Sequence, residues 1–471
     1  MLMHSALVAL CATAVAALKP LKIEGNRFVD DEGQALQIVG MAYQPGGSAG
    51  YDPQTGKDPL SHKEECLRDA ALMQILGINA IRVYNLGPDI NHDECASIFN
   101  AAGMYMMIDV NSPLPGEAIT SFEPWTSYYA EYLNRTFAIV EAFSNYPNTL
   151  LFFSGNEIIN DLPSAEFVPP YMRAITRDLK NYIKNNIDRQ IPVGYSAADV
   201  RDVLWDTYNY VSCSIDGEED DMSRADFFAL NSYSWCGKEA TFETSSFDDL
   251  VEGFEGSPVP VFFSEYGCNE TPERWWTETQ SIYGDDMYNT FSGGVVYEWT
   301  QEKNDYGLVE VGKEETQLLN DYTQLKEQLG KITWEDVQSL KATKDNKWVE
   351  CKPSLIKEKG FMNNFTLPAL PPGAKKLIDN GIKPKPVGQI IKIDSWNVTL
   401  DVADVEGNPI ENLAVVPLED ANWSGKNDAS VGGTPKAEES KDDSEDEEDS
   451  AIMSVPVMWA AALPLVAMLL A

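Results

Sequence analysis

Eight short apolar runs alternate with amphipathic stretches between residues 19 and 328 of this 471-residue chain. Apolar runs bounded by turn residues predict buried strands, and the stretches between them have the spacing of helices. Strands that alternate with helices form a parallel sheet, so eight such units over about 300 residues predict an α/β fold, the (β/α)8 TIM barrel. The predicted strands are Gln37–Tyr43, Asn79–Tyr84, Met104–Asp109, Thr149–Glu157, Ile191–Tyr195, Ala225–Asn231, Val259–Glu265 and Gly293–Glu298.

The stretches between the strands supply the predicted helices. Gly77 and Gly103 end the first two of them, because glycine readily stops a helix at its C-terminus. The competing fold, an open doubly wound sheet, usually has a glycine-rich phosphate loop after its first strand. No GxGxxG motif occurs in this chain, so the barrel is favoured. The predicted helices are Glu64–Leu76, Cys95–Ala102, Trp125–Ser144, Pro170–Asn185, Phe247–Phe254 and Trp275–Met287.

Two glutamates, Glu157 and Glu265, each end one of the apolar runs, on the fourth and the seventh predicted strand. A carboxylate in such a place is costly unless it has a partner or a role. Both strand ends lie on the C-terminal face of a TIM barrel, where the active sites of this fold lie. The pair therefore predicts the acid and the nucleophile of a retaining glycosidase, about 5 Å apart. The acid should have a raised pKa and the nucleophile an ordinary one.

The alternative for each glutamate taken alone is a salt bridge at the rim of the barrel. Two glutamates that each follow a Phe-Phe-Ser strand, one of them directly after Asn156, favour catalysis over that alternative. Other chemistries lack residues: the chain has three histidines, His4, His62 and His92, and no CxxC pair. A serine-histidine triad and a zinc site are therefore disfavoured, and we expect no cofactor and no metal.

The predicted strand ends also carry aromatic and amide side chains. Sugars stack on aromatic faces and form hydrogen bonds with amides, so a groove with this lining suits an oligosaccharide. Each residue alone is more simply explained by packing at the rim, but five such clusters on one face favour a sugar-binding cleft. The clusters are Tyr43-Gln44, Tyr84-Asn85, Asp109 with Asn111 and Ser112, Asn231 with Tyr233, and Tyr297-Glu298-Trp299.

The formal net charge of −39 argues against nucleic-acid binding, which needs a basic surface. Much of the acid is local, since residues 438–449 hold nine acidic residues against one lysine. Such a block is typical of a solvated spacer rather than a binding site. We divide the chain into residues 1–17, 18–330 (the barrel), 331–424 (a small C-terminal β-rich domain), 425–450 (an acidic, serine-containing linker) and 451–471.

Both ends of the chain have the composition of targeting signals. Residues 1–17 are short, apolar and alanine-rich, which predicts a secretory signal peptide cleaved near Ala16 or Ala17. Residues 451–471 follow a polar spacer and end in an apolar tail, which predicts attachment of a glycosylphosphatidylinositol (GPI) anchor. The alternative is a tail-anchor helix, which the prolines in the tail and the lack of flanking cations disfavour. The candidate attachment residues are Ser440, Ser444 and Ser450.

Six cysteines remain once the signal peptide is removed, and an even number in a secreted chain predicts three disulfides, with fifteen possible connectivities. Five Asn-x-Ser/Thr sequons predict candidate glycosylation sites on the surface. The asparagines are Asn134, Asn269, Asn364, Asn397 and Asn422.

Several motifs, in order along the chain, resemble the fungal cell-wall β-1,3-glucanosyltransferases, glycoside hydrolase family 72. The resemblance covers most of residues 19–330. The motifs are Gly40-Met-Ala-Tyr-Gln-Pro-Gly-Gly, Ile81-Arg-Val-Tyr, Ser154-Gly-Asn-Glu, Ile191-Pro-Val-Gly-Tyr-Ser-Ala-Ala-Asp, Tyr233-Ser-Trp-Cys-Gly, Phe263-Ser-Glu-Tyr-Gly-Cys, Gly294-Val-Val-Tyr-Glu-Trp and Asn304-Asp-Tyr-Gly-Leu-Val.

The resemblance implies a retaining transglycosylase with Glu157 as acid/base and Glu265 as nucleophile. Such an enzyme cleaves an internal β-1,3-glucan bond and transfers the new reducing end to the non-reducing end of another glucan chain. The resemblance also implies disulfides Cys66–Cys95, Cys213–Cys351 and Cys236–Cys268. The implied glucan contacts are Gln44, Tyr84, Asp109, Asn156, Asp199, Tyr233 and Tyr297, to which the cleft residues Asn111 and Ser112 are added.

The chain departs from the family pattern in two places. Many members have an arginine five residues after the aspartate of the Ser-Ala-Ala-Asp motif, where this chain has Leu204, although Arg201 lies nearby. Some members carry a cysteine-rich carbohydrate-binding module after the barrel, and six mature cysteines indicate the subgroup without it. The interpretation is a monomeric enzyme on the outer face of the plasma membrane and in the cell wall. The alternatives are a secreted retaining β-glucan hydrolase and a non-catalytic glucan-binding wall protein.

Overall fold

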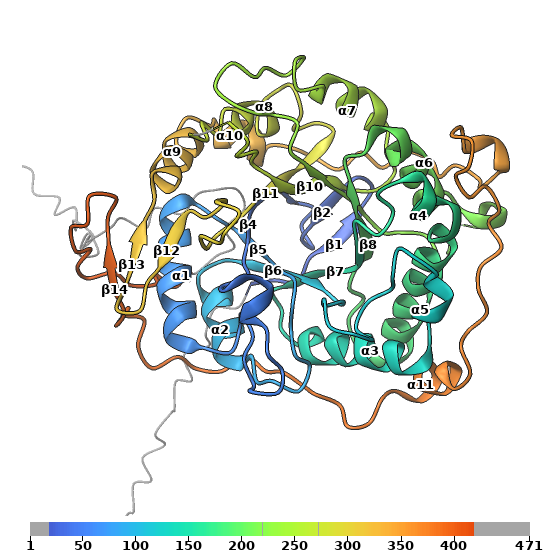
Figure 1. Ribbon diagram of the computed structural model, residues 1–471, viewed down its shortest axis with the longest axis horizontal. Helices are drawn as coiled ribbons and strands as arrows, with labels where there is room; N and C mark the ends of the chain where they lie inside the picture. The colour runs from blue at the N-terminus through green and yellow to red at the C-terminus, as the bar shows by residue number, and fades with distance from the viewer. Residues whose placement is uncertain (1–17, 219, 272, 419–471) are drawn as a thin grey trace, which may run out of the picture. The chain divides into compact units, whose positions relative to one another are not determined.

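Eight parallel strands form a closed barrel in the computed structural model, which describes residues 18–218, 220–271 and 273–418 (Figure 1). Each strand pairs in parallel with its neighbours in sequence, and the eighth pairs with the first, with Gly293 opposite Ile38. The predicted TIM barrel is confirmed. Its strands are β4 (Ile38–Ala42), β5 (Ala80–Val83), β6 (Tyr105–Asp109), β7 (Thr149–Asn156), β8 (Val193–Ala198), β9 (Phe228–Ser232), β10 (Val261–Tyr266) and β11 (Phe291–Val296).

Large apolar side chains fill the barrel interior. The rings of Phe153, Phe227 and Phe262 lie 5.3–6.2 Å apart between centroids, and all three are fully buried. The ring of Phe28 packs on Phe227 and Phe262 from below. It comes from a small antiparallel sheet that precedes the barrel, so this sheet closes the N-terminal end and leaves the C-terminal end for a site. The sheet consists of β1 (Lys22–Glu24), β2 (Arg27–Val29) and β3 (Ala35–Leu36).

Helices surround the barrel as a ring (Figure 1). The first ends as predicted, because Gly77 adopts a left-handed conformation (φ 76°) at its C-cap. Three helices of the ring, α4, α6 and α9, were not predicted. The ring consists of α1 (Lys63–Leu76), α2 (Asp93–Ala101), α3 (Ala130–Ser144), α4 (Leu162–Phe167), α5 (Pro169–Asn186), α6 (Arg201–Ser212), α7 (Phe247–Phe254), α8 (Glu278–Ile282) and α9 (Asn320–Leu329).

Two helices are shorter than predicted. The helix predicted from Trp125 begins only at Ala130, because Pro124–Thr126 form a separate 3-10 turn and Tyr129 is extended. The helix predicted over Trp275–Met287 is reduced to α8, since Trp276 has a positive φ of 54° that no helix residue adopts. This conformation buries the Trp276 indole, whose Nε1 donates to the Asp321 carbonyl at 3.0 Å.

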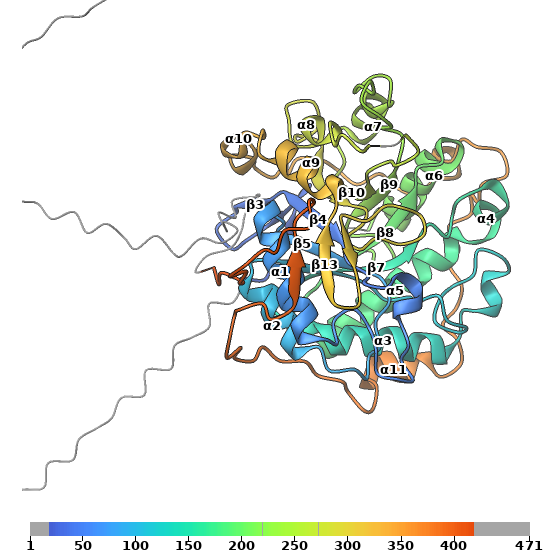
Figure 2. The same cartoon turned by 60° about the vertical axis from the view of Figure 1, so that its left-hand side comes forward.

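A second small sheet lies outside the barrel, where Figure 2 shows it facing the viewer. Two of its strands, β12 (Val309–Val311) and β13 (Glu315–Leu318), come from the predicted barrel range. The third, β14 (Asp401–Ala403), comes from residues 331–424 and pairs in parallel with β13. The described part of that range also contains α10 (Trp334–Gln338) and α11 (Ala374–Asn380).

Most of residues 341–418 form an extended segment, the belt, which Figure 1 shows in orange around the outside of the helical ring. Apart from β14, which pairs with β13, the belt bonds to the ring at several points. The Met362 N–H donates to the Ala165 carbonyl of α4 (3.0 Å), and the Ile391 N–H donates to Ser97 Oγ of α2 (2.9 Å). At these points the belt backbone finds its hydrogen-bond partners on the helices rather than in a sheet.

The belt therefore contains less regular β structure than the sequence suggests. The β-like pieces at 389–393 and 396–400 carry one isolated bridge, between Asn397 and Ala414. Residues 18–418 fall within one compact unit, so the described part of the β-rich C-terminal region is packed on the barrel.

Three disulfides join parts of the described chain, and the pairs are those that the family resemblance implies. Cys66–Cys95 joins α1 to α2, and Cys236–Cys268 joins the loops that follow β9 and β10. Cys213–Cys351 joins the end of α6 to the belt.

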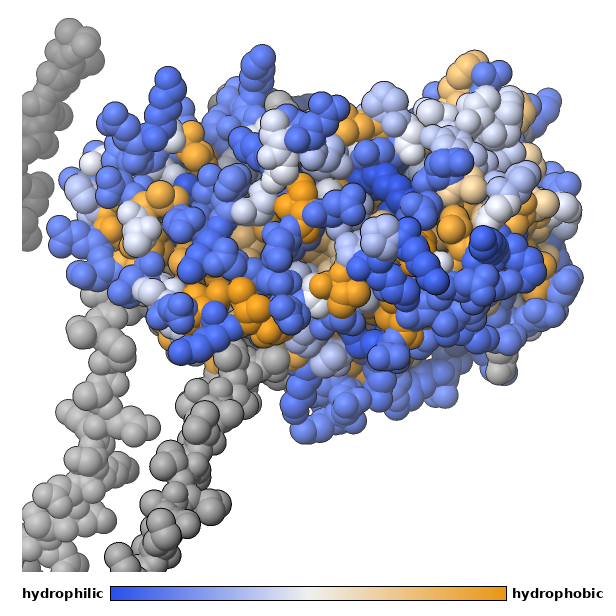
Figure 3. Space-filling view, turned by 90° about the horizontal axis from the view of Figure 1, so that it is seen from below, coloured by the Kyte–Doolittle hydropathy of each residue, from blue (hydrophilic) through white to orange (hydrophobic). Residues whose placement is uncertain are grey.

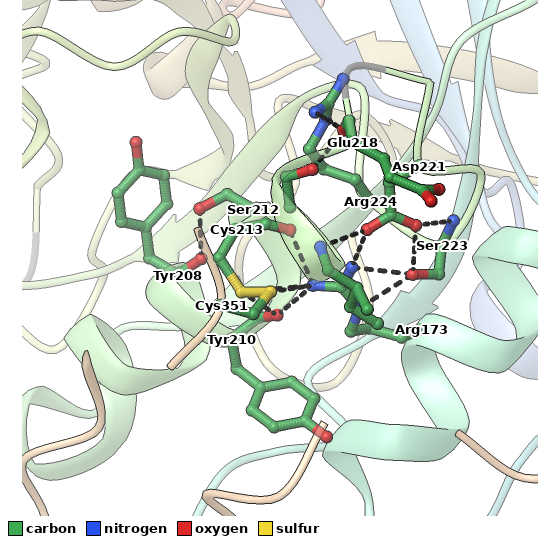
Figure 4. Close-up of a disulfide and its surroundings, with 12 residues drawn as sticks. Arg173, Tyr208, Tyr210, Ser212, Cys213, Glu218, Asp221, Ser223, Arg224 and Cys351 are labelled. Atoms are coloured by element: carbon green, nitrogen blue, oxygen red, sulfur yellow. Dashed lines mark hydrogen bonds and ion pairs between the residues drawn. A yellow bond between two sulfur atoms is a disulfide. The ribbon is translucent and has the colours of Figure 1, made fainter. Parts of the chain in front are cut away.

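Arg173 of α5 lies against the third disulfide, as Figure 4 shows. Its Nη1 donates to the carbonyls of Tyr210 (2.7 Å) and Cys213 (2.9 Å), and its Nη2 pairs with Asp221 Oδ2 at 2.6 Å. A fully buried arginine thus fixes the backbone at the point where the belt is attached.

The surface is mostly hydrophilic on the face drawn in Figure 3, where apolar residues form small separate groups. Of the sequon asparagines, Asn134, Asn364 and Asn397 are exposed and Asn269 is half-buried. Within the described ranges, no helix combines the length and the apolar character that crossing a membrane requires. The predicted signal peptide, acidic linker and GPI tail, with Asn422, lie outside the described residues.

Candidate active site

Glu265 lies near the end of β10, where only 7% of its surface is exposed. Three donors hold its carboxylate. Oε1 accepts hydrogen bonds from Arg82 Nη1 at 3.1 Å and from the Tyr84 hydroxyl at 3.0 Å. Oε2 accepts a hydrogen bond from the Tyr233 hydroxyl at 2.6 Å. The side chain is therefore fixed in one orientation, and its donors favour the ionised form.

Arg82 is the centre of this arrangement and is fully buried within the barrel. Besides Glu265, its guanidinium contacts Asp109 through Nε (3.0 Å) and Asn156 Oδ1 through Nη2 (2.8 Å). It also lies 4.4 Å from the centroid of the Tyr84 ring, a cation–π contact. Its Nη1 also donates to Asn231 Oδ1 at 3.3 Å, so one side chain contacts residues of four strands, β6, β7, β9 and β10.

Glu157 follows β7 directly and is half-buried. Its backbone has a positive φ of 52°, a strained conformation for a residue with a side chain and one that is frequent at functional sites. The Glu157 N–H donates to the Ser196 carbonyl at 2.9 Å, and the Tyr195 hydroxyl accepts from the Ile159 N–H at 2.9 Å. A Cβ on Gly155, within β7, would lie 2.8 Å from the sulfur of Met172, so a larger residue there would require the Met172 side chain to shift.

Asn156 is half-buried beside Glu157. Its Oδ1 accepts hydrogen bonds from Arg82 (2.8 Å), Ser196 Oγ (2.7 Å) and Asn231 Nδ2 (3.0 Å). These bonds orient the amide, and no described residue bonds to its Nδ2. The arrangement presents an N–H donor to a ligand, as the sequence predicts for a sugar hydroxyl.

Four tyrosine rings form an aromatic wall next to Glu265. Tyr297 lies edge-to-face with Tyr84 (6.5 Å between centroids), Tyr233 (6.1 Å) and Tyr306 (5.3 Å). The predicted contacts Tyr84, Tyr233 and Tyr297 are therefore together in space, and Tyr306 is an addition. Such a wall can pack against the apolar face of a sugar ring.

Two further predicted contacts are held by neighbours at strand ends. Gln44 Oε1 accepts a hydrogen bond from the Asn85 N–H at 3.1 Å. Asp199 accepts hydrogen bonds from Arg201 Nε at 2.5 Å and from the Ser232 hydroxyl at 2.6 Å. Asp199 is thus part of an ion pair at the end of β8.

Leu204, at the position where many family members have arginine, is fully buried in α6 and belongs to the main hydrophobic core. The cation near Asp199 is Arg201, the first residue of α6. Arg201 therefore partners this aspartate, and Leu204 does not face the cleft.

Asn111 and Ser112 turn their polar atoms toward the scaffold. Asn111 Oδ1 accepts from the Tyr132 hydroxyl at 2.6 Å, and Asn111 Nδ2 donates to the Ser154 carbonyl at 3.0 Å. The Ser112 hydroxyl donates to the Glu117 carboxylate. The structure thus brings these two residues to the cleft wall but engages their side chains in supporting the loop after β6.

A cleft of about 310 Å³ lies beside Asn156. The strand ends form one side of it, and the loop after β6 forms the other. It is lined by residues that include Tyr84, Asp109, Asn156, Pro113, Ala118 and Ile119.

Burial raises the pKa of Glu265 to about 7, while the Arg82 guanidinium and the Tyr233 hydroxyl act to lower it. The negative charge of Glu157 raises it further. The sequence predicts an ordinary pKa for this residue, and the structure corrects that prediction because the strand end is deeply buried. A carboxylate of higher pKa is also a stronger nucleophile.

Several residues of the site were missed from the sequence. Arg82 occurs within an apolar strand, and a charged residue in such a run is a signal that could have identified it. Ser196 and Ser264 form a buried polar layer with Asn231 beneath Asn156, and Ser264 Oγ donates to Asn231 Oδ1 at 2.7 Å. The sequence places Asn231 in a predicted cleft cluster, but the two serines look ordinary in sequence, because serine is common.

One group of potential metal ligands occurs among the described residues: Cys236, Cys268 and Glu270. Both of these sulfurs are in a disulfide, so neither is a thiolate that could bind a metal. The side chains at the barrel mouth instead offer two carboxyl groups, an oriented amide and an aromatic wall. This set of groups suits acid/base and nucleophilic chemistry at a glycosidic bond.

Comparison with known proteins gives relatives along most of the chain. The model of the glucanosyltransferase family, glycoside hydrolase family 72, matches residues 10–333. The chain is 47% identical to the 1,3-β-glucanosyltransferase gel2 of Aspergillus fumigatus over 405 residues, which are 85% of this chain and 84% of the relative. It is 41% identical to the probable 1,3-β-glucanosyltransferase GAS3 of Saccharomyces cerevisiae, covering 82% of this chain and 77% of the relative.

A solved structure of Saccharomyces cerevisiae Gas2p, a glutamate-to-glutamine mutant in complex with laminaritetraose and laminaripentaose, has a TM-score of 0.66 to this chain. The two are 33% identical, and the match covers 76% of each chain. The sequence relatives, the family model and the barrel agree, and the chain belongs to the glucanosyltransferase family, glycoside hydrolase family 72.

Proposed function

We propose that the protein remodels β-1,3-glucan as a retaining glucanosyltransferase. It cleaves an internal β-1,3 bond of one glucan chain and joins the new reducing end to the non-reducing end of another. The relatives gel2 and GAS3 carry the name 1,3-β-glucanosyltransferase, and the Gas2p structure holds two laminari-oligosaccharides. The observation in this chain that carries the proposal is Glu265, held by Arg82, Tyr84 and Tyr233, next to the charge of Glu157.

In the first step Glu265 attacks the anomeric carbon of the sugar at the cleavage point. The glycosidic bond breaks as a bond to the Glu265 carboxylate forms, and the Glu157 carboxyl gives its proton to the departing glycosidic oxygen. The departing chain leaves with a free hydroxyl, and the other part remains as a glycosyl ester. The Asn156 amide, oriented by Arg82, donates to the 2-hydroxyl, where a hydrogen bond strengthens in the transition state.

In the second step a hydroxyl at the non-reducing end of another chain attacks the glycosyl ester. Glu157, now ionised, takes the proton of that hydroxyl, and the bond to Glu265 breaks. Two inversions leave the new bond with the β configuration. The same residues would serve water as acceptor, so a retaining hydrolase is the second candidate, and exclusion of water from the acceptor side decides between the two.

The proposal includes secretion, a GPI anchor at the outer face of the plasma membrane, and glycosylation. Residues 1–17 and 451–471 support the first two by their composition. Three disulfides are typical of a chain that matures in an oxidising compartment. Three of the sequon asparagines are exposed, as attachment of a glycan requires. The proposed unit is a monomer, because one chain supplies every side chain of the site.

The test is to incubate the soluble ectodomain with a reduced β-1,3-gluco-oligosaccharide and to follow product lengths by mass spectrometry. Products longer than the substrate are expected, together with shorter ones. Shorter products alone would make the protein a hydrolase. Glu157→Gln and Glu265→Gln should each abolish the products, and full activity in both variants would overturn the assignment of the two residues.

A further inference from the structure

Two segments at the C-terminal end of the barrel carry large aromatic side chains that are exposed. Phe122 (76% exposed) and Trp125 (49%) lie in the loop between β6 and α3. Phe167 (41%) ends α4, which follows β7. Exposed aromatic side chains in such a group are unusual on a soluble domain and mark binding surfaces. We call Trp125 and Phe167, with Phe122, the aromatic platform.

Trp125 and Phe167 contact each other across the two segments. Their ring centroids are 5.7 Å apart and their planes are inclined by 84°, an edge-to-face pair. The contact places two rings side by side at the surface although 42 positions separate them in the sequence. An edge-to-face pair leaves ring surface free for a ligand, and the pairing fixes both orientations.

The loop that carries Phe122 and Trp125 is braced from within. The Thr120 hydroxyl donates to the Phe122 carbonyl (2.6 Å), and the Thr120 N–H donates to Ser127 Oγ (3.0 Å). Trp125 itself lies in the 3-10 turn Pro124–Thr126. The two aromatic side chains are therefore held at the surface by a defined backbone.

The segment that carries Phe167 is equally fixed. Asp161 and Ser164 form a capping box at the start of α4, with the Ser164 N–H donating to Asp161 Oδ1 at 2.8 Å. The belt supports the other side of the helix, because the Met362 N–H donates to the Ala165 carbonyl. A surface held in this way loses little conformational entropy when it binds a ligand.

Two chain segments connect the platform to the cleft beside Asn156. The loop after β6 lines that cleft with Pro113, Ala118 and Ile119 before it reaches Phe122. On the other side, Ile158 lines the cleft and α4 begins only four residues further on. Both segments thus lead from the cleft to the platform on the side of Glu157.

The acceptor chain binds on the same side of the cleavage point as Glu157. The acid/base gives its proton to the departing chain and later takes a proton from the acceptor, so both chains occupy the same side of the cleavage point. A chain that leaves the cleft along the Glu157 side meets the platform. Pyranose rings have apolar faces that stack on aromatic rings, and the exposed Glu123 and Glu166 offer hydrogen-bond acceptors for their hydroxyls.

We propose that Trp125 and Phe167, with Phe122, form a distal subsite for the acceptor β-1,3-glucan chain. The inference rests on the proposed function, since it needs a transfer reaction. It assigns the platform the role of selecting long acceptors over short ones and over water. A chain anchored at the platform stays close to the glycosyl ester, which favours transfer.

The test compares the wild type with Trp125→Ala/Phe167→Ala in transfer from one reduced donor to a disaccharide or to a decasaccharide acceptor. The variant should show an acceptor KM for the decasaccharide about fivefold to tenfold higher, as loss of aromatic contacts of this size predicts. Its KM for the disaccharide should be unchanged, and hydrolysis products should increase. Trp125→Tyr/Phe167→Tyr, which keeps an aromatic ring at each position, should restore most of the preference for the long acceptor.

Tyr288→Ala is the matched control, because this half-buried tyrosine precedes β11 at the opposite end of the barrel. An unchanged decasaccharide KM in the double alanine variant would overturn the inference, as would an equal rise for both acceptors. If the wild type itself forms no longer products, the proposed function fails instead. If the effect follows donor length alone, the platform binds the donor and the acceptor assignment is wrong.

Discussion

Arg82 and Glu265 form a buried ion pair across the barrel, with 3.1 Å between Nη1 and Oε1. Arg82 is also bonded to Asp109 through two nitrogens, so its position does not depend on Glu265. The arginine is therefore fixed before any substrate binds, and the carboxylate is held in place by it. Preorganised charges of this kind contribute strongly to catalysis, because they need not reorient during the reaction.

Arg82→Lys tests this relationship. Lysine keeps the charge but lacks the planar fork that reaches Glu265, Asp109 and Asn156 at once. We expect kcat for transfer to fall roughly a hundredfold, the size of loss found when a preorganised donor is removed. Steady-state kinetics on a reduced β-1,3-gluco-oligosaccharide measures the change.

The control for this prediction is Arg177→Lys, which makes the same substitution in the Arg177–Asp178 pair away from the cleft. That variant should keep the wild-type kcat. Wild-type kcat in a folded Arg82→Lys variant would contradict the role given to Arg82.

The sequence was sufficient to predict the barrel, because alternating apolar runs are a local signal. The strand-end carboxylates Glu157 and Glu265 are local signals of the same kind, and their catalytic roles stay a prediction. The Arg82 network was missed, since its contacts join four strands and depend on which strand residues point inward. The shortened helix at Trp276 and the burial of Leu204 depend on tertiary packing that no window of sequence displays.

The belt shows the same limit in another form. Its extended stretches have the composition of strands, but their N–H groups bond to side chains such as Ser97 and to helix carbonyls such as that of Ala165. Sequence patterns indicate that a segment is extended, and they do not indicate which partner it finds.

Glu265→Gln should change the pH dependence of stability. The folded-state pKa of Glu265 is raised to about 7 by burial, from an ordinary value of 4.5. Between these values the folded state binds the proton more tightly than the unfolded state, so stability decreases as pH rises through the window. Above about pH 7 the full loss of unfolding free energy from this group is about 3 kcal/mol.

Glutamine has no such titration, so the variant should gain stability relative to the wild type between about pH 4 and about pH 8. Thermal unfolding of both proteins across this range measures the difference. Glu157→Gln, at a half-buried position, is the comparison variant. A constant difference between Glu265→Gln and wild type at all pH values would rule out the raised pKa.

Tyr233→Phe removes the 2.6 Å hydrogen bond to Glu265 Oε2 and leaves the ring in the aromatic wall. The lost donor no longer stabilises the carboxylate as it leaves the glycosyl ester, so kcat should fall roughly tenfold to a hundredfold with a small change in KM. Tyr306→Phe is the control, since its ring lies 5.7 Å from that of Tyr233 but its hydroxyl does not contact Glu265. Equal kcat values for the two variants would exclude a specific role for the Tyr233 hydroxyl.

Loss of two of the disulfides should affect stability and activity differently. Cys213–Cys351 joins α6 to the belt, away from the barrel mouth, whereas Cys236–Cys268 joins the loops that follow Tyr233 and Glu265. Replacing both cysteines of the first pair by serine should cost about 2–4 kcal/mol of unfolding free energy and leave the kcat of the folded protein unchanged. Replacing the second pair should lower kcat as well, because the loops that position the nucleophile and its tyrosine are released.

Thermal unfolding and transfer kinetics on the two double variants distinguish the roles. A loss of kcat in the first variant alone would show that the belt, not the loop disulfide, supports the site.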